Sequence, residues 1–208
     1  VKHAIILAAG GSTRLGHPKQ LVRWGDGNLL THTIETIHAA GTDTIHVVVG
    51  AHRDAIIASV HAKHFPSLGW LNNQDWRAGQ STSLRLAIDE LQPHWNQQDA
   101  ILIALCDQPL IPAEHYAALV DAVAQRNFLS AATLYPSGAG VPACINAGVL
   151  GTLDFSGDRG AKHWLRNQPT GDVCLMPCPA ATYDIDSPQD EFDVRQQTAV
   201  ALPPKTPF

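Results

Sequence analysis

The feature that most constrains the fold is an alternation of short apolar runs with segments whose apolar residues recur at helical spacing. Three of the runs are typical of buried strands, at residues 4–9, 45–49 and 100–105. Chains that alternate in this way fold into a mainly parallel sheet with helices packed on both faces. We therefore expect an α/β, Rossmann-like fold, in which ligands bind at the carboxyl ends of the strands.

The other elements of the first 130 residues follow from the same periodicity. We predict helices around residues 30–37, over 53–61, from about 80 to 91 and from Pro112 onward, with a short strand at 70–72.

Beyond Ser130 glycines and prolines interrupt the pattern, and spacing alone does not order the segments there. Near the end of the chain, residues 182–185 are typical of a last strand. The segment that follows predicts a helix with Ser187 as its N-cap, Pro188 at its first position and the acid Asp190 at its third.

The length of the chain favours one domain. At 208 residues it can bury one sizeable core but not two. We expect that domain to span residues 1–200, with residues 201–208, which include three prolines, as a frayed tail.

Charge and residue composition exclude several classes of protein. The formal net charge of −5 argues against a nucleic-acid partner or a membrane surface, so any cationic groups act locally. The four cysteines lack zinc-ribbon spacing and the chain opens directly with a core strand, which predicts a cytoplasmic protein with free thiols. None of the 11 histidines falls in a metal-binding motif, and we assign none of them to a metal.

A glycine loop follows the first predicted strand. Gly10, Gly11 and Ser12 are followed by two cations, Arg14 and Lys19. Glycine lets backbone N–H groups approach an anion closely, while the two side chains supply full positive charges, so this loop indicates a phosphate site. It is neither a P-loop, which needs Gly-Lys-Ser/Thr, nor a dinucleotide fingerprint, which needs Gly-x-Gly-x-x-Gly.

An aspartate follows the predicted strand at 100–105, within Cys106-Asp107-Gln108-Pro109. Parallel strands end at one edge of a sheet, so Asp107 should lie at the same edge as the glycine loop. Mg²⁺ needs one or two carboxylates and fills its other positions with water and phosphate oxygens, so Asp107 suffices for a magnesium site. The alternative is that Asp107 only forms the turn before the proline.

These motifs resemble nucleotidyltransferases of the molybdenum-cofactor type. The family opens with Leu-Ala-Ala/Gly-Gly-x-Ser-x-Arg-Met-Gly-x-x-Lys, which residues 7–19 match with Leu15 in place of methionine. Residues 105–109 match its second hallmark, whose aspartate binds the metal on the nucleotide phosphates. Residues 73–84, 157–162 and 184–188 match three further family motifs, so the resemblance covers nearly the whole chain.

The resemblance implies a set of site residues. Arg14, Lys19 and Asp107 would be catalytic, and Asp107 with Asp186 would hold Mg²⁺. The residues implied in nucleotide binding are Leu7, Ala8, Ala9, Gly10, Gly11, Ser12, Asn73, Ser81, Ser83, Gln108 and Pro109.

Some of these residues have a second interpretation. Asp186 could instead complement the start of the helix at Ser187, and Asn73 with residues 81–83 could cap the helix that begins near Gln80. Trp76 we interpret as a packing residue.

The resemblance also implies a reaction, the transfer of CMP from CTP to the phosphate of molybdopterin with release of pyrophosphate. Family members that use CTP carry Leu-Ala-Ala-Gly with Cys-Asp-Gln-Pro, as this chain does. The Ala9 methyl would fill space that a purine needs. Since the acceptor phosphate is already anionic near neutral pH, no general base is needed.

The acceptor is the least defined part of this interpretation. Residues 1–128 would form the nucleotide-binding half and residues 129–200 the acceptor-binding half. A pterin predicts a deep, partly apolar cleft, whereas a sugar 1-phosphate or another phosphorylated alcohol predicts separate polar contacts. A cofactor-binding chaperone without chemistry is a further alternative, and a transient contact with a molybdoenzyme or its chaperone stays open.

Overall fold

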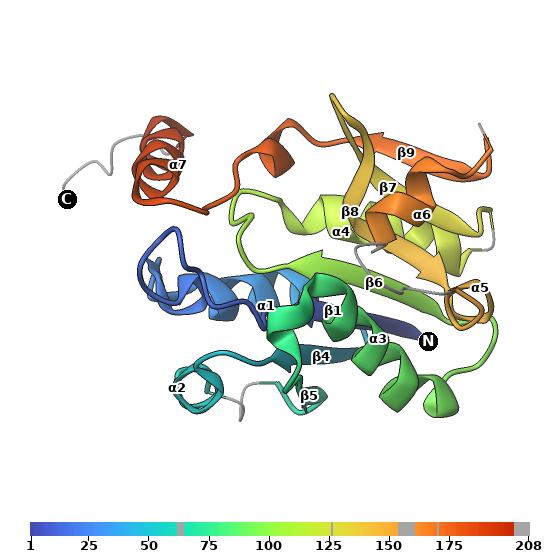
Figure 1. Ribbon diagram of the computed structural model, residues 1–208. Coiled ribbons are helices and arrows are strands. Elements are labelled where there is room, and N and C mark those ends of the chain that lie inside the picture. The colour runs from blue at the N-terminus through green and yellow to red at the C-terminus, as the bar shows by residue number, and fades with distance from the viewer. Residues whose placement is uncertain (62–64, 126, 154–160, 170, 202–208) are drawn as a thin grey trace.

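The computed structural model describes residues 1–61, 65–125, 127–153, 161–169 and 171–201. Its centre is a seven-stranded sheet in the order β5-β4-β1-β6-β8-β7-β9 (Figure 1). The strands are β1 (Lys2–Leu7), β4 (Thr44–Val49), β5 (Leu68–Asn72), β6 (Ala100–Leu105), β7 (Ser130–Tyr135), β8 (Gly138–Asn146) and β9 (Val173–Pro177). Of these, β8 alone runs antiparallel to its neighbours, and the short strands β2 (Arg23–Trp24) and β3 (Gly27–Asn28) form a separate hairpin.

Helices cover both faces of this sheet. They are α1 (Leu29–Ala39), α2 (Arg53–Ala58), α3 (Gln80–Leu91), α4 (Ala113–Ala124), α5 (Ala147–Leu150), α6 (Ala161–Arg166) and α7 (Pro188–Ala201). The strand residues alternate between two cores. In β1, Ala4 and Ile6 pack with α1, α2 and α4, whereas Ile5 and Leu7 pack with α3, α5 and α6. The predicted α/β fold with a mainly parallel sheet and helices on both faces is confirmed.

The carboxyl ends of β1 and β6 lie side by side. The register pairs Leu7 of β1 with Leu105 of β6, so the glycine loop and Asp107 leave the sheet at one edge. Figure 1 shows α7 beyond this same edge. Residues 8 and 9 lie past the end of β1, but Ala8 still donates to the carbonyl of Val48 and Ala9 accepts from Ala51.

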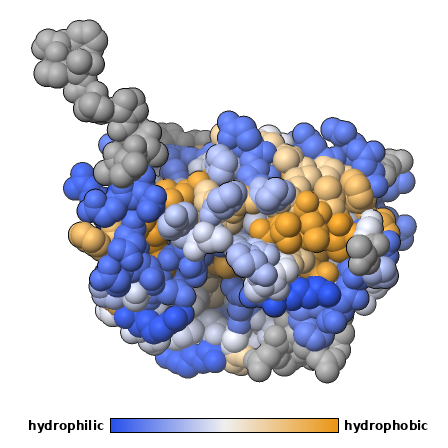
Figure 2. Space-filling view, turned by 90° about the horizontal axis from the view of Figure 1, so that it is seen from above, coloured by the Kyte–Doolittle hydropathy of each residue, from blue (hydrophilic) through white to orange (hydrophobic). Residues whose placement is uncertain are grey.

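The prediction of a last strand at residues 182–185 was wrong. Residues 179–182 form a 3₁₀ helix, and Ile185 is fully buried outside the sheet, in a small cluster with Leu29 and Val194. The last strand is β9, at the edge of the sheet. There Leu175 is 46% exposed, and Figure 2 shows an apolar area on this side of the molecule. The apolar residues 173–176 were the available signal, but they are short and lie in the part of the chain where glycines and prolines obscure the pattern.

Three smaller differences concern element ends. The helix predicted over 53–61 ends at Ala58, Pro112 is the N-cap of α4 rather than its first residue, and the strand predicted over 4–9 ends at Leu7. Residues 157–160 of one family motif and the predicted frayed tail from 202 onward lie outside the described residues. Within the described ranges no helix has the length and apolar character needed to cross a membrane.

Candidate active site

One buried amide fixes the shape of the glycine loop. Gln20 is only 1% exposed and donates from Nε2 to the carbonyl oxygens of Ala8 at 2.6 Å and Gly10 at 3.0 Å. Ser12 has a φ of 52°, in the left-handed region, and its Oγ accepts from the backbone N–H of Lys19 at 3.0 Å. The loop is therefore held by its own contacts. The sequence analysis did not predict this role of Gln20. The available signal was that Gln20 is a polar residue directly after Lys19, the last residue of the loop motif.

Replacing Gln20 with leucine is expected to lower the free energy of unfolding by about 2–4 kcal/mol, because two carbonyls would lose their shared donor. Urea unfolding measures this loss. Gln189→Leu is the control, since Gln189 bonds Asp193 on the exposed surface of α7 and its loss should cost less than about 0.5 kcal/mol. Equal effects of the two substitutions would contradict the role given to Gln20.

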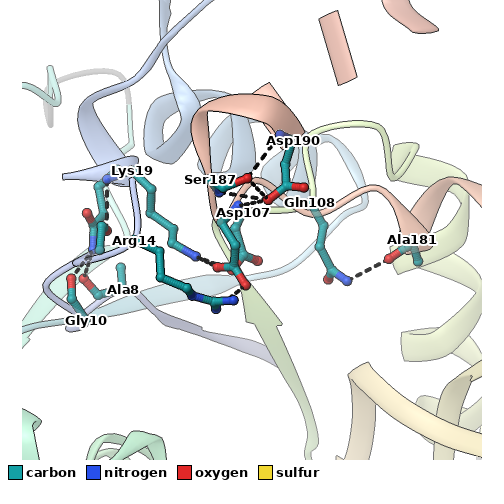
Figure 3. A network of polar contacts seen from close by, with 12 residues as sticks. Ala8, Gly10, Arg14, Lys19, Asp107, Gln108, Ala181, Ser187 and Asp190 are labelled. Atoms are coloured by element: carbon teal, nitrogen blue, oxygen red, sulfur yellow. Dashed lines mark hydrogen bonds and ion pairs between the residues drawn. The ribbon is translucent and has the colours of Figure 1, made fainter. Parts of the chain in front are cut away.

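Four charged side chains from three distant segments meet beside this loop. Lys19 donates from Nζ to Asp107 Oδ2 at 2.9 Å and to Asp186 Oδ1 at 2.5 Å. Arg14 donates from Nη2 to Asp186 Oδ2 at 2.6 Å. Figure 3 shows Arg14 and Lys19 reaching from the loop toward Asp107 at the end of β6. The structure thus brings together all four residues that the sequence analysis assigned to catalysis and metal binding.

Burial and charge compete in setting the protonation of this cluster. Burial alone would lower the pKa of Lys19, but Asp107 and Asp186 raise it well above its usual value. Burial raises the pKa of Asp107, and Lys19 only partly offsets this. Burial also opposes ionisation of Asp186, but the hydrogen bonds and positive charges of Lys19 and Arg14 together outweigh burial and lower the pKa of Asp186. Asp186 and Lys19 are therefore charged near neutral pH.

The start of α7 positions Asp186. Asp190 Oδ2 accepts from the backbone N–H of Ser187 at 2.7 Å, from its Oγ at 2.8 Å and from the N–H of Asp186 at 3.2 Å. The Ser187 hydroxyl accepts in return from the N–H of Asp190 at 3.3 Å, which completes a capping box. Ser187 and Asp190 therefore cap α7 (Figure 3). The Asp186 carboxylate takes no part in capping and contacts Arg14 and Lys19 instead.

The cluster suits a divalent cation bound together with phosphates. Asp107 Oδ1 is buried and has no hydrogen-bond partner among the described residues, which is costly unless a cation or donor approaches it. Within the described ranges no three histidine, cysteine or acidic side chains gather into a complete ligand set. Asp107 and Asp186 would supply two oxygens, and Mg²⁺ takes the rest from water and substrate phosphates.

Asn73 has a structural role at the start of α3. It is 4% exposed, donates from Nδ2 to Thr82 Oγ1 at 2.8 Å and Ser83 Oγ at 2.9 Å, and accepts at Oδ1 from the N–H of Asp75. Both polar atoms of its side chain are therefore engaged within the segment, which fits the helix-start interpretation. Asn73 and Ser81 also line an open hollow of about 670 Å³ beside α3.

A small cavity of about 110 Å³ lies between the glycine loop and the start of α3. Its lining residues are Leu7, Ala9, Gly10, Trp76, Gly79, Gln80 and Ser83. Trp76 also packs against the loop, since a Cβ added to Gly11 would lie 3.1 Å from its ring. Trp76 is thus a packing residue, as predicted, and forms a wall of this cavity as well.

A larger cavity of about 540 Å³ lies on the other side of β6, toward β7 and β8. Its lining residues are Gln80, Leu105, Gln108, Tyr135, Pro136, Ser137, Val141, Lys162, Ala181, Thr182 and Asp184. Gln108 donates from Nε2 to Tyr135 Oη and to the carbonyl of Ala181, both at 2.8 Å, and Tyr135 donates to the carbonyl of Val141 at 2.6 Å. Figure 3 shows the Gln108 amide turned toward Ala181.

The structure therefore separates two residues that the sequence analysis grouped with the nucleotide. Gln108 faces the larger cavity, and buried Pro109 uses its carbonyl to bond His32 Nε2 at 2.9 Å. The sequence analysis also missed Tyr135 and Lys162 as cavity residues. No local motif marks Tyr135, because its position depends on the antiparallel pairing of β7 with β8.

Comparisons with known proteins agree with this geometry. A family model described as the MobA-like NTP transferase domain matches residues 4–173. Nicotine blue oxidoreductase of Paenarthrobacter nicotinovorans is 30% identical over 175 residues, which cover 79% of this chain and 81% of that protein.

Among solved structures, Rv0371c from Mycobacterium tuberculosis H37Rv is similar with a TM-score of 0.77 at 24% identity, over 94% of this chain and 97% of that one. A 4-diphosphocytidyl-2C-methyl-D-erythritol synthase is similar with a TM-score of 0.67 at 20% identity, over 95% and 98%. These likenesses show the same fold. Because the family model spans most of the chain, including the glycine loop, Lys19 and Asp107, the protein belongs to the MobA-like NTP transferase family and is a nucleotidyltransferase.

Proposed function

We propose that this protein transfers CMP from CTP to the phosphate of a molybdopterin-type acceptor and releases pyrophosphate, with Mg²⁺ as its metal. The observation that carries the proposal is the charged cluster, in which Lys19 contacts Asp107 and Asp186 beside a glycine loop. Cations for phosphates and carboxylates for a metal are what nucleotidyl transfer needs, because its catalysis is chiefly positioning and neutralisation of charge on phosphate oxygens.

Each group has a defined task in this reaction. Arg14 and Lys19 would bind the triphosphate, and the backbone of residues 10–12 would lie against it. Asp107 and Asp186 would hold Mg²⁺, which neutralises charge on the phosphate oxygens when bound. The acceptor phosphate attacks the α-phosphorus as an anion, so the site needs no general base.

The small cavity supports a pyrimidine nucleotide. Ala9 and Trp76 both line it, and at about 110 Å³ it favours one ring over two. The name of the 4-diphosphocytidyl-2C-methyl-D-erythritol synthase, which shares the fold, refers to a cytidine diphosphate product, and this adds support for CTP.

Replacing Ala9 with glycine is expected to reduce the preference for CTP over GTP about tenfold, since one methyl group discriminates by about 1–3 kcal/mol. The kcat/KM ratio for the two nucleotides measures this change. Ala4→Gly is the control, because Ala4 is also buried, within β1, but does not line the cavity. A ratio that stays constant in Ala9→Gly would place base selection elsewhere.

The larger cavity supports a pterin-type acceptor. It combines apolar walls, such as Leu105 and Val141, with polar groups and the cation Lys162. A volume of about 540 Å³ is large enough for a flat bicyclic or tricyclic ligand. A sugar phosphate would need only shallow polar contacts and no cavity of this size.

Replacing Gln108 with leucine is expected to raise the KM for the acceptor about fivefold and to leave the KM for CTP within about twofold. The reason is that Gln108 positions Tyr135 in the larger cavity, and one lost hydrogen bond is worth about 1 kcal/mol. Initial rates with either substrate varied give both constants. An equal rise in the two KM values would show that Gln108 contributes to nucleotide binding as well.

An acceptor panel tests the proposed reaction. The protein is incubated with CTP, Mg²⁺ and molybdopterin, a sugar 1-phosphate or a phosphorylated alcohol, and pyrophosphate is measured. Pyrophosphate release with molybdopterin and with no other acceptor supports the proposal. Pyrophosphate release only with a sugar phosphate would show that the acceptor is a sugar phosphate instead. Tight molybdopterin binding without pyrophosphate would favour a carrier. In a separate incubation, reduction of added nicotine blue by an added reductant would favour the redox activity in the name of the Paenarthrobacter relative.

A further inference from the structure

Lys19 by itself contacts both carboxylates that the proposed function assigns to the divalent cation. Its Nζ lies 2.9 Å from Asp107 Oδ2 and 2.5 Å from Asp186 Oδ1. The second oxygen of Asp186 is bonded to Arg14 at 2.6 Å. Both oxygens of Asp186 therefore already contact a positive group, and the only oxygen of the pair without a partner among the described residues is Asp107 Oδ1.

A divalent cation that bridged the two acids would come close to the Lys19 ammonium. Mg²⁺ lies about 2.0–2.1 Å from its oxygen ligands, shorter than the hydrogen bonds of Lys19 to those oxygens. The Lys19 side chain is only 15% exposed, so water screens the repulsion between the two cations poorly. The cation and the ammonium thus compete for the same position.

The charge of the cluster points to what resolves this competition. The two cations Arg14 and Lys19 already offset Asp107 and Asp186, the two carboxylates that they contact. A divalent cation added alone would leave the cluster positive. A nucleotide triphosphate adds several negative charges and offers oxygens to Lys19 and Arg14, which frees the carboxylates.

We propose that Lys19 is a built-in counter-ion that keeps divalent cations away from Asp107 and Asp186 until the phosphates of the nucleotide draw its ammonium aside. The cation and the nucleotide then bind cooperatively, each strengthening the binding of the other. This inference rests on the proposed function, which makes the two aspartates metal ligands, but it differs from it in assigning Lys19 a second role that opposes metal binding.

Binding of Mn²⁺ to the protein without nucleotide tests the inference. Free Mn²⁺ is followed by electron paramagnetic resonance during titration of the full chain. We expect Lys19→Met to lower the Kd for Mn²⁺ at least about tenfold relative to the unsubstituted protein. Lys19→Gln is a second neutral variant, in case the methionine variant does not fold, and circular dichroism checks both.

Two further variants make the result specific. Lys2→Met is the matched control, because Lys2 pairs with Asp121 at 2.9 Å at the opposite end of β1 and should leave the Kd unchanged. Asp107→Asn combined with Lys19→Met should abolish the gain. If Lys19→Met and the unsubstituted protein bind Mn²⁺ equally through Asp107, the inference is wrong while the metal assignment stands. If no variant binds Mn²⁺, the metal assignment itself fails.

Discussion

Replacing Asp107 with asparagine is expected to lower turnover with CTP at least about 1000-fold while the protein stays folded. The substitution removes the charge that the proposed metal requires, and such electrostatic contributions are among the largest in catalysis. Stability should change little, because burial already raises the pKa of Asp107 and Lys19 keeps its bond to Asp186. Pyrophosphate release and the melting temperature measure the two effects.

The control for Asp107 is Asp172→Asn, which removes an exposed acid outside the cluster. It should leave turnover within about twofold. Turnover that survives in Asp107→Asn would remove this residue from the reaction. A melting temperature that falls by more than about 10 °C would show instead that the carboxylate mainly supports the fold.

Replacing Lys19 with methionine is expected to lower kcat/KM for CTP about 100- to 1000-fold. The ammonium is the most buried cation of the cluster, and its removal takes away one charge-assisted contact to the triphosphate. Steady-state kinetics at saturating acceptor measure the loss. Lys2→Met, which removes an ion-paired lysine at the other end of β1, should behave like the unsubstituted protein.

The Lys19 variant also separates two roles of the residue. If Lys19 binds phosphates and opposes the metal, the variant should bind Mn²⁺ more tightly and yet react more slowly. Tighter Mn²⁺ binding together with unchanged kcat/KM would contradict a role in phosphate binding. Unchanged kinetics and unchanged Mn²⁺ binding would remove Lys19 from the site altogether.

The sequence predicted the first half of the fold well because its strands are buried on both faces. The run at 100–105 is continuously apolar and the run at 45–49 is interrupted only by His46, and the two coincide closely with β6 and β4. The second half is built differently. There β7 and β8 form a largely buried antiparallel pair, but serine, threonine, glycine and proline interrupt their apolar residues, and β9 lies partly exposed at the edge of the sheet. Ile185 was predicted to lie in a strand because it is apolar, but it packs in a small cluster outside the sheet.

The sequence also predicted which charged residues meet, by topology for Asp107 and by the family resemblance for Asp186. Parallel strands end at one edge, and the register of β1 with β6 places the loop of Lys19 beside Asp107. The contacts within the site were less predictable. That Gln20 holds the loop and that Gln108 bonds Tyr135 depends on side-chain direction, which spacing does not encode.

The most direct test of the central claim is an incubation of the protein with Mg²⁺, molybdopterin and each of the four α-labelled ribonucleoside triphosphates in turn. Labelled dinucleotide and pyrophosphate are measured in each reaction. We predict that label passes to molybdopterin from CTP and that pyrophosphate appears in equal amount. Absence of transfer from all four nucleotides would contradict the proposed cytidylyl transfer to molybdopterin.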